Sequence, residues 1–341
     1  MINRKRTVVV YGQGFCGSKG DVSVVRALLH EGYDVVWLVN SSKRKMDLFE
    51  FEELLEAEGV LENLRTIQLE ENDLYPYVKD KDNLMVEGSV PYAIIHMGLI
   101  YDEGLSKDDP IGHYCSNVQN TLHLVKLYWD LGMRKFILNC QYDLGASEST
   151  HSLNSITDSM MVSGALGSGE LRTITYSEIV GELPYDYIDT DGETKEEFIT
   201  FGNDDTSIIN IISNLKEDND GIHRIDLNEE IYKNRLGSAI KSNAVRNYVF
   251  GADLDNLHIA LLDRGFDSDI PDDLYIGVDA TTKEVLDRMS SCGKLEYKFT
   301  PENEMEEEHK CRIKHNIPES LIKEKDLTTD LNKLIVDNDK E

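Results

Sequence analysis

The chain has 341 residues, of which 40% are hydrophobic, and its formal charge at pH 7 is −29. This length can hold one large α/β domain or two smaller ones with a full core, and the excess of carboxylates excludes nucleic acid and anionic membranes as expected partners. No apolar run reaches the ~20 residues that a membrane span needs. The five cysteines are scattered and never spaced as C-x-x-C. We therefore expect a cytoplasmic protein with reduced thiols and no metal site.

Short apolar runs rich in β-branched residues recur through the first half of the chain. Such runs fit strands that are buried on both faces of a parallel sheet. Between them apolar residues return at helical spacing, and two of these stretches end at glycines, Gly32 and Gly132, which commonly stop helices. The alternation predicts a Rossmann-like, doubly wound α/β fold. The predicted strands cover residues 7–11, 34–39, 65–69, 93–97 and 135–139, and the predicted helices cover 22–32, 49–59 and 120–132.

The pattern weakens after about residue 150. Residues 147–159 are rich in Ser, Thr and Asn and predict a loop, and residues 186–220 are acidic with little periodicity. A strand is predicted over 172–181, a helix over 256–265 and a strand over 273–279. We expect a dinucleotide-binding domain over residues 1–180, a smaller C-terminal α/β lobe of the substrate-binding type over 181–322, and a charged tail over 323–341.

Three glycines follow the first predicted strand with the spacing G-x-G-x-x-G, at Gly12, Gly14 and Gly17. This spacing lets the chain turn sharply and bring its amides against a pyrophosphate; the alternative is a turn that needs glycine for packing alone. A short insertion that includes Gly20 and Asp21 precedes the helix. We expect these two residues to form a turn, and the Asp21 carboxylate to weaken phosphate binding at the helix N-terminus.

The end of the second predicted strand lacks the acidic residue that usually accepts hydrogen bonds from the ribose of NAD. Val39 and Asn40 stand there, followed by the sequence SSKRK over residues 41–45. This hydroxyl-rich and basic segment could meet the 2′-phosphate of NADP, or it could be a solvated loop. The sequence leaves both NAD and NADP open as cofactors.

In order and spacing, these segments resemble the extended short-chain dehydrogenase/reductase family, and within it the NAD-dependent epimerase/dehydratases of the UDP-galactose 4-epimerase type. GFCGS resembles that family's G-F-I-G-S, and YAIIHMGLIYDEGLS its strand ending in I-H-x-A-G. IGHYCSNVQNTLHLVKLYWDLGMRKFILN resembles its Y-x-x-N-V-x-G-T-L helix with the K-x-F-V-F-x-S strand, and AVRNYVFGADLDNLHIALLD its V-R-D-Y-x-H-V-x-D-L helix. The resemblance runs, with gaps, over most of residues 7–300.

The resemblance implies a cofactor site and a substrate contact at the positions that match. The glycines and neighbouring amides would face the pyrophosphate, and the other residues would line the adenosine, middle and nicotinamide parts of the cofactor. Asp73 could instead cap a turn, and Asn117 could tie two helices together. The implied cofactor-binding residues are Gly12, Gly14, Phe15, Cys16, Gly17, Asn40, Ser42, Asp73, Met97, Gly98 and Asn117, and the implied substrate-binding residue is Arg246.

The catalytic residues of that family have no match. Its chemistry requires a tyrosine with a lysine four residues later on one helix, and Val162 and Leu166 take those two places. Gln141 falls near the position of its catalytic hydroxyl. A Tyr-x-x-x-Lys pattern does occur from Tyr77 to Lys81, but it precedes the fourth predicted strand, in a charged loop, and is expected to be a coincidence. Acidic residues also replace the arginine that would bind the substrate diphosphate, at positions 302, 304, 306, 307 and 308.

We therefore expect a degenerate epimerase/dehydratase-like protein that has no catalytic residue and acts as a scaffold or interaction protein, with NAD or NADP as an optional ligand. Its expected partners are a second copy of the chain or another protein, because helices like residues 120–132 pair between subunits in the family. The alternative is an active nucleotide-sugar epimerase or dehydratase in which Tyr142 or Tyr176 serves as the base. A metal or hydrolytic enzyme is set aside, since no ligand spacing and no G-x-S-x-G occurs.

Overall fold

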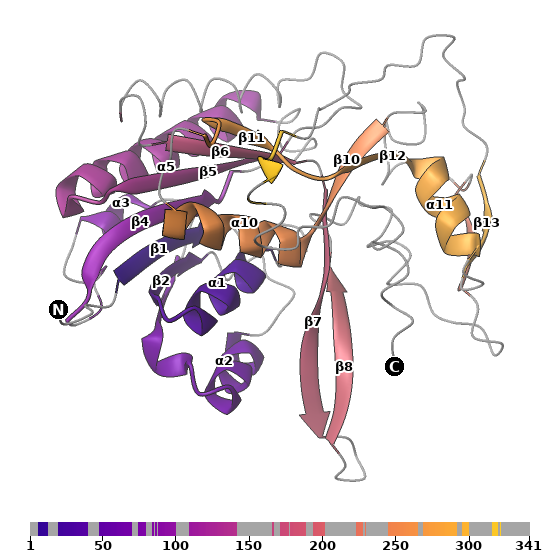
Figure 1. Cartoon of the computed structure of the whole chain (residues 1–341), viewed down its shortest axis with the longest axis horizontal. Coiled ribbons are helices and arrows are strands. Elements are labelled where there is room, and N and C mark those ends of the chain that lie inside the picture. Colours follow the sequence, from indigo (N-terminus) through magenta and orange to yellow (C-terminus); the bar gives the residue numbers. More distant parts are fainter. Residues whose placement is uncertain are drawn as a thin grey trace.

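The fold is seen in a computed structural model of the chain (Figure 1). It describes residues 6–12, 20–39, 48–69, 74–79, 84, 86, 88–99, 109–141, 166, 171–176, 178–188, 194–201, 223–227, 229, 245–264, 269–291, 295–299, 316–319 and 321. The predicted loop over 147–159 and the charged tail over 323–341 lie outside these residues.

A seven-stranded parallel sheet forms the centre of the molecule, with the strand order β11-β6-β5-β4-β1-β2-β3. All five strands predicted in the first half are present as β1 to β5, which confirms the doubly wound α/β fold. The order reverses between β1 and β4, and ligands of open α/β sheets bind at the carboxyl ends of strands at such a point. The strands are β1 (Arg6–Gly12), β2 (Asp34–Val39), β3 (Leu64–Gln68), β4 (Val90–Met97), β5 (Lys135–Gln141), β6 (Leu171–Tyr176) and β11 (Asp273–Tyr275).

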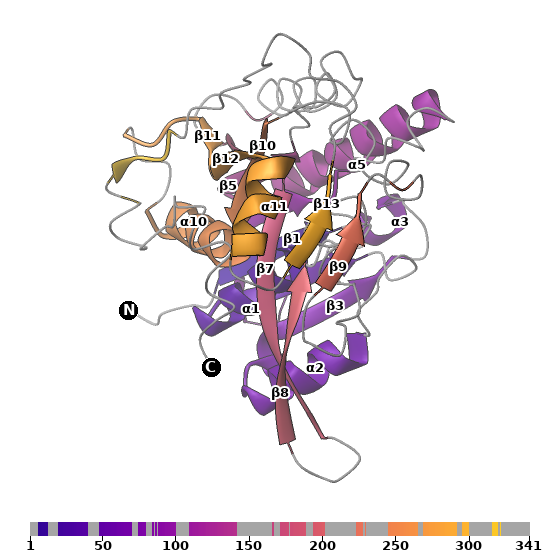
Figure 2. The same cartoon turned by 90° about the vertical axis from the view of Figure 1, so that its right-hand side faces the viewer.

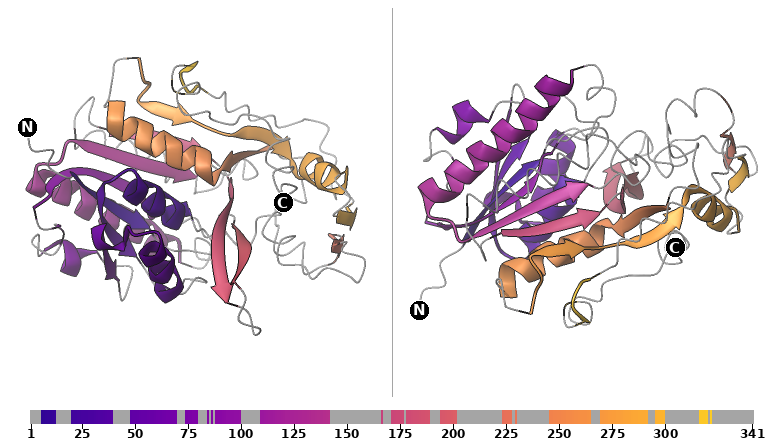
Figure 3. Two further views of the ribbon diagram at one scale, coloured as in Figure 1. Left: turned by 60° about the horizontal axis from the view of Figure 1, so that its bottom comes forward. Right: turned by 90° about the horizontal axis from the view of Figure 1, so that it is seen from above.

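Helices cover both faces of this sheet and enclose two hydrophobic cores (Figures 2 and 3). Alternate residues of β1 point to opposite faces, so Val8 and Val10 belong to one core and Val9 and Tyr11 to the other. The first core is closed by α1 (Gly20–His30), α2 (Leu48–Ala57) and α10 (Gly251–Arg264). The second is closed by α3 (Tyr75–Val78) and α5 (Pro110–Leu131), and the short 3-10 helix η3 (Leu61–Asn63) precedes β3.

The predicted helix ends are confirmed. Gly32 and Gly132 follow α1 and α5 with φ angles of 84° and 63°, the left-handed conformation that glycine adopts without strain. Helix α5 extends further towards the N-terminus than residues 120–132, because the Asp109 side chain caps it by accepting a 3.0 Å hydrogen bond from the Gly112 amide. The turn predicted at Gly20 and Asp21 is wrong, since both residues lie in the first turn of α1.

A second sheet of four strands has the order β12-β10-β7-β8 and includes a long hairpin that projects away from the main sheet (Figure 1). The strands are β7 (Glu178–Ile188), β8 (Thr194–Phe201), β10 (Val245–Phe250) and β12 (Val278–Thr281), and a separate pair is formed by β9 (His223–Asp226) and β13 (Leu295–Lys298), beside α11 (Thr282–Ser291).

Two predictions in the second half of the chain are wrong in detail. The single strand predicted over 172–181 is two strands, β6 and β7, and β7 continues into the acidic stretch that showed no strand pattern. The strand predicted over 273–279 is also two, because Gly277 has a φ of 123° and breaks it into β11 and β12, which belong to different sheets.

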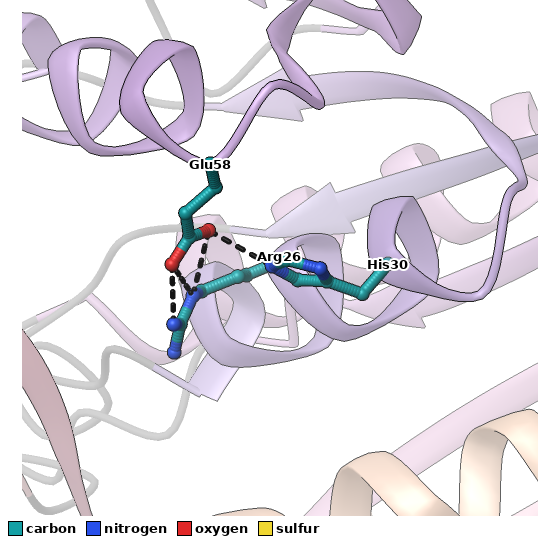
Figure 4. A network of polar contacts seen from close by, with 3 residues as sticks. All are labelled: Arg26, His30 and Glu58. Atoms are coloured by element: carbon teal, nitrogen blue, oxygen red, sulfur yellow. Dashed lines mark hydrogen bonds and ion pairs between the residues drawn. The ribbon is translucent and has the colours of Figure 1, made fainter.

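Polar contacts fix α1 to its neighbours. Glu58, just after α2, accepts hydrogen bonds from Arg26 Nε at 3.0 Å and from His30 Nε2 at 2.9 Å (Figure 4). Burial alone would raise the pKa of the Glu58 carboxyl, but these hydrogen bonds outweigh it and the pKa is lowered. On the other side of α1, the Ser23 hydroxyl donates to the buried Asp255 carboxyl of α10. Helix α1 is therefore held between α2 and α10.

None of the helices in the described part of the chain combines the length and the apolar character needed to cross a membrane.

Candidate functional site

The candidate site lies at the carboxyl ends of β1, β2 and β4, where the strand order of the main sheet reverses. Gly12 is the last residue of β1, and it is in register with Val39 of β2 and Met97 of β4. Gly98 follows directly. The structure thus brings Gly12, Met97 and Gly98, three of the residues that the resemblance implies, together at the place where this fold class binds ligands.

Gly12 is covered by a side chain of α1. A Cβ atom placed on Gly12 would lie 2.0 Å from Asp21 Oδ2 and 2.5 Å from Asp21 Cγ, so the carboxylate rests directly on the glycine backbone. Asp21 is 3% exposed. Its Oδ2 accepts a hydrogen bond of 3.2 Å from the indole Nε1 of Trp37 in β2. A buried anion from the protein itself therefore occupies the N-terminal end of α1.

A chain of hydrogen bonds links Gly98 to Asn117. The Gly98 amide donates to His96 Nδ1 at 3.1 Å, so the ring proton is on Nε2, which donates to Thr121 Oγ1 at 3.0 Å. The Thr121 hydroxyl in turn donates to the Asn117 carbonyl at 2.8 Å. Burial lowers the pKa of His96 to about 3, which keeps the ring neutral. This chain fixes the Gly98 backbone to α5.

Gly98 is also required by close packing. A Cβ atom there would lie 2.4 Å from Cε1 of the Tyr11 ring, and Tyr11 is fully buried. The Tyr11 hydroxyl accepts a hydrogen bond of 3.1 Å from Asn120 Nδ2 on α5. The ring therefore cannot move aside easily, and the two strand ends lie in close contact.

A second buried histidine, His258 on α10, is held against β5. Its Nδ1 donates to the Leu254 carbonyl at 2.7 Å, and its Nε2 accepts from Asn139 Nδ2 at 3.0 Å. Burial lowers the pKa of His258 to about 4, more than the hydrogen bond to Leu254 raises it. Neither His96 nor His258 can therefore carry a charge near neutral pH, and both act as fixed hydrogen-bonding groups of the core.

The position that the resemblance assigns to the catalytic lysine is apolar. Leu166 is 4% exposed and belongs to the core closed by α5, together with Phe136 and Leu138 of β5. Tyr77, the tyrosine of the coincidental Tyr-x-x-x-Lys pattern, packs against the same core from α3. Leu166 and Tyr77 therefore both contribute to the apolar core between β5, α3 and α5.

The remaining predicted site residues are not all placed. Arg246 lies on β10 of the four-stranded sheet, in register with Ala280 of β12. Tyr176 ends β6 and is in register with Gln141 at the end of β5. Among the described residues, no group of three or more His, Cys, Asp or Glu side chains could hold a metal ion. The residues outside the described part of the chain are Gly14, Phe15, Cys16, Gly17, Asn40, Ser42, Asp73, Tyr142 and Val162.

Sequence reasoning missed Trp37, which binds the Asp21 carboxylate, and the histidine of α10. A tryptophan inside a predicted buried strand was the one signal available, since an indole N–H in a core usually needs an acceptor. The partner of His258 is 119 positions away in sequence, and no periodicity connects residues over that separation.

Comparisons with known proteins identify the fold. No family model and no curated protein matches the chain. Among solved structures, the UDP-glucose 4-epimerase of Bifidobacterium longum in complex with NAD⁺ and UDP is 14% identical, covers 96% of both chains and has a TM-score of 0.56.

Two further structures give the same result. The UDP-glucose 4-epimerase of Stenotrophomonas maltophila, with bound NAD and formylated UDP-arabinopyranose, is 12% identical with a TM-score of 0.60, over 98% of this chain and 96% of that one. Pal from Bacillus thuringiensis is 14% identical with a TM-score of 0.58, over 97% and 96%. The described part of the chain therefore has the Rossmann-like α/β fold that these UDP-glucose 4-epimerases also have.

Proposed function

We propose that this chain is a cytoplasmic, non-catalytic protein with the epimerase fold, which acts as a scaffold or interaction protein. The observation that carries the proposal is the burial of Leu166 in an apolar core at the position that the resemblance assigns to the catalytic lysine. Fold similarity alone does not support an activity, because function depends on the residues of the site.

The chemical reason is the proton transfer. Epimerisation of a sugar hydroxyl needs a base with a pKa near the working pH, which the family obtains from a phenol beside an ammonium group. A leucine side chain carries no charge and donates no hydrogen bond, so Leu166 can neither lower the pKa of a phenol nor hold a ribose. Among the described residues, His96 and His258 are buried and engaged in core hydrogen bonds.

The second candidate function, an active epimerase with a rearranged centre, is favoured by one observation. Tyr176 ends β6 in register with Gln141, at the same carboxyl edge of the sheet as Gly12. A base supplied from that edge would act on a nucleotide-sugar bound across the strand ends.

We expect no turnover when the purified protein is incubated with NAD and UDP-galactose or UDP-glucose and the sugars are separated by chromatography. The Tyr176→Phe and Tyr142→Phe variants should give the same background as the native chain. Turnover by the native chain that either substitution abolishes would instead establish the second candidate.

The proposed partner is a second copy of the chain, bound through α5. Apolar residues and Cys115 lie on one face of this helix at positions 111, 115, 118 and 122, at steps of four and three, and Trp129 follows seven residues after Leu122, the spacing of a seam between paired helices. Ile111 is 75% exposed, Trp129 56% and Leu122 44%. Large side chains of this kind on one helix face indicate a protein contact, and identical helices can pair about a two-fold axis.

Replacing Leu122 with aspartate should convert the dimer to a monomer, because the variant places a charge in the apolar seam. Light scattering coupled to size-exclusion chromatography would give the mass directly. Phe49→Asp is the matched control, since Phe49 is 63% exposed on α2, in the helix layer opposite α5. A native chain that is monomeric at high micromolar concentration, or a Leu122→Asp variant that remains dimeric, would contradict the proposal.

A further inference from the structure

We infer that the Asp21 carboxylate takes the place of a cofactor phosphate at the N-terminus of α1, so that the native chain excludes NAD and NADP while it keeps the fold that binds NAD in its structural relatives. This exclusion of NAD and NADP deepens the proposed non-catalytic function. Catalytic turnover and nucleotide uptake are measured separately, so either proposal can fail without the other.

The Asp21 side chain fills the space that a phosphate would need. In this fold class the glycine at the end of the first strand lets a pyrophosphate approach the backbone. Here the space over Gly12 is filled, because Asp21 Oδ2, Cγ and Cβ would lie 2.0, 2.5 and 2.6 Å from a Cβ atom on that glycine. These are atoms of the protein in van der Waals contact with the Gly12 backbone. A phosphate that approached the same backbone would overlap them.

The charge of Asp21 also opposes a phosphate at the N-terminus of α1. The N-terminus of a helix carries a partial positive charge that stabilises one nearby anion, and Asp21 in the first turn of α1 already supplies that anion. Because Asp21 is 3% exposed, water screens its charge poorly. A pyrophosphate would add like charge to the same place, and this repulsion would weaken its binding.

The Asp21 carboxylate is held in place by its neighbours. Trp37 Nε1 donates to Asp21 Oδ2, and Trp37 is fully buried, with its ring edge-to-face against Phe51 at 5.4 Å between centroids. Turning the Asp21 side chain away from Gly12 would break this hydrogen bond and would move the carboxylate through the packed contact between α1 and the sheet. The carboxylate is thus part of the core rather than a flexible surface group.

The part of a nucleotide that is rejected is the diphosphate. Asp21 lies against Gly12 at the end of β1, whereas the adenosine would lie beyond β2. NAD, NADP and ADP, which all carry a diphosphate, should therefore be excluded together, whereas adenosine should be affected little by any change at Asp21.

Isothermal titration calorimetry with NAD, NADP, ADP and adenosine tests the inference on the native chain, Asp21→Asn and Asp21→Ala. Asparagine removes the charge but keeps the size, and alanine removes both. We expect no uptake of the diphosphates by the native chain at low millimolar concentration, and roughly tenfold or more tighter binding in Asp21→Ala, with Asp21→Asn intermediate. Adenosine should bind all three forms alike.

Glu31→Gln is the control, because it removes the same charge at the exposed C-terminal end of α1 and should bind diphosphates no better than the native chain. Far-ultraviolet circular dichroism establishes that each variant is folded, and Asp21→Asn, which can still accept from Trp37, keeps the test decisive if the alanine variant unfolds. Native protein that binds NAD as tightly as the Asp21 variants would overturn the inference, as would folded Asp21 variants that gain no affinity for any diphosphate.

Discussion

Replacing Asp255 with asparagine is expected to stabilise the protein at pH 8 and to remove a large pH dependence of its stability. Asp255 is buried between α10 and α1. Burial raises the pKa of its carboxyl from 3.8 to about 7, more than the hydrogen bond from Ser23 and the charge of Arg26 lower it. The folded state therefore binds this proton more tightly than the unfolded state does.

The sign of the effect follows from that difference. Below pH 3.8 the carboxyl is protonated in both states and costs nothing, and between pH 3.8 and 7 folding must retain a proton that the unfolded chain has lost. As the pH rises through that window, the free energy of unfolding falls by about 1.4 kcal/mol per pH unit, to a total loss of roughly 4 kcal/mol. Asparagine stays neutral throughout, and its side-chain oxygen can accept the Ser23 hydrogen bond.

Urea unfolding of the native chain and Asp255→Asn at pH 4, 5, 6, 7 and 8 would measure the difference in the free energy of unfolding. We expect this difference to grow in favour of the variant up to about pH 7 and then to level. Glu31→Gln, which removes an exposed carboxylate just after α1, controls for the overall charge of −29. A difference that does not change with pH would show that Asp255 does not hold its proton.

The second large effect is expected from Gly12→Ala. The new methyl group would overlap the buried Asp21 carboxylate, and forcing extra volume into a packed core typically costs about 1–3 kcal/mol. Removing Asp21 should relieve the overlap. We therefore expect Gly12→Ala to be much less destabilising in an Asp21→Ala background than in the native one.

Thermal or urea unfolding of the two single variants and the double variant gives the coupling between the positions directly. We expect the double variant to be more stable than the sum of the single effects by on the order of 1 kcal/mol or more. Additive effects would mean that the carboxylate does not lie on Gly12 as the structure shows.

Much of the first half of the fold could be predicted because its signals are local. The runs that became β1, β2, β4 and β5 are largely apolar on both faces, and Gly32 and Gly132 end α1 and α5 in the conformation that glycine favours. The second half was predicted less well, since apolar periodicity does not tell which sheet a strand joins. The glycine at position 277 is visible in the sequence, but the sequence does not show that it separates β11 from β12.

The candidate site was predictable in the same measure. Gly12 and Met97 end buried strands and Gly98 follows directly, and parallel strands bring their carboxyl ends to one edge. The sequence placed Asp21 in a turn, whereas the residue lies in the first turn of α1. The partners of the buried side chains, such as Trp37 for Asp21 and Asn139 for His258, depend on packing between distant segments and left no pattern in the sequence.

Native mass spectrometry of the purified chain in excess NAD counts subunits and bound nucleotides in the same particle. We expect a species of two chains that carries no NAD, and NAD on each chain once Asp21 is replaced by alanine. A native species in which every chain holds NAD would contradict the inference, since the Asp21 carboxylate that lies on Gly12 and the phosphates of NAD cannot occupy the same space.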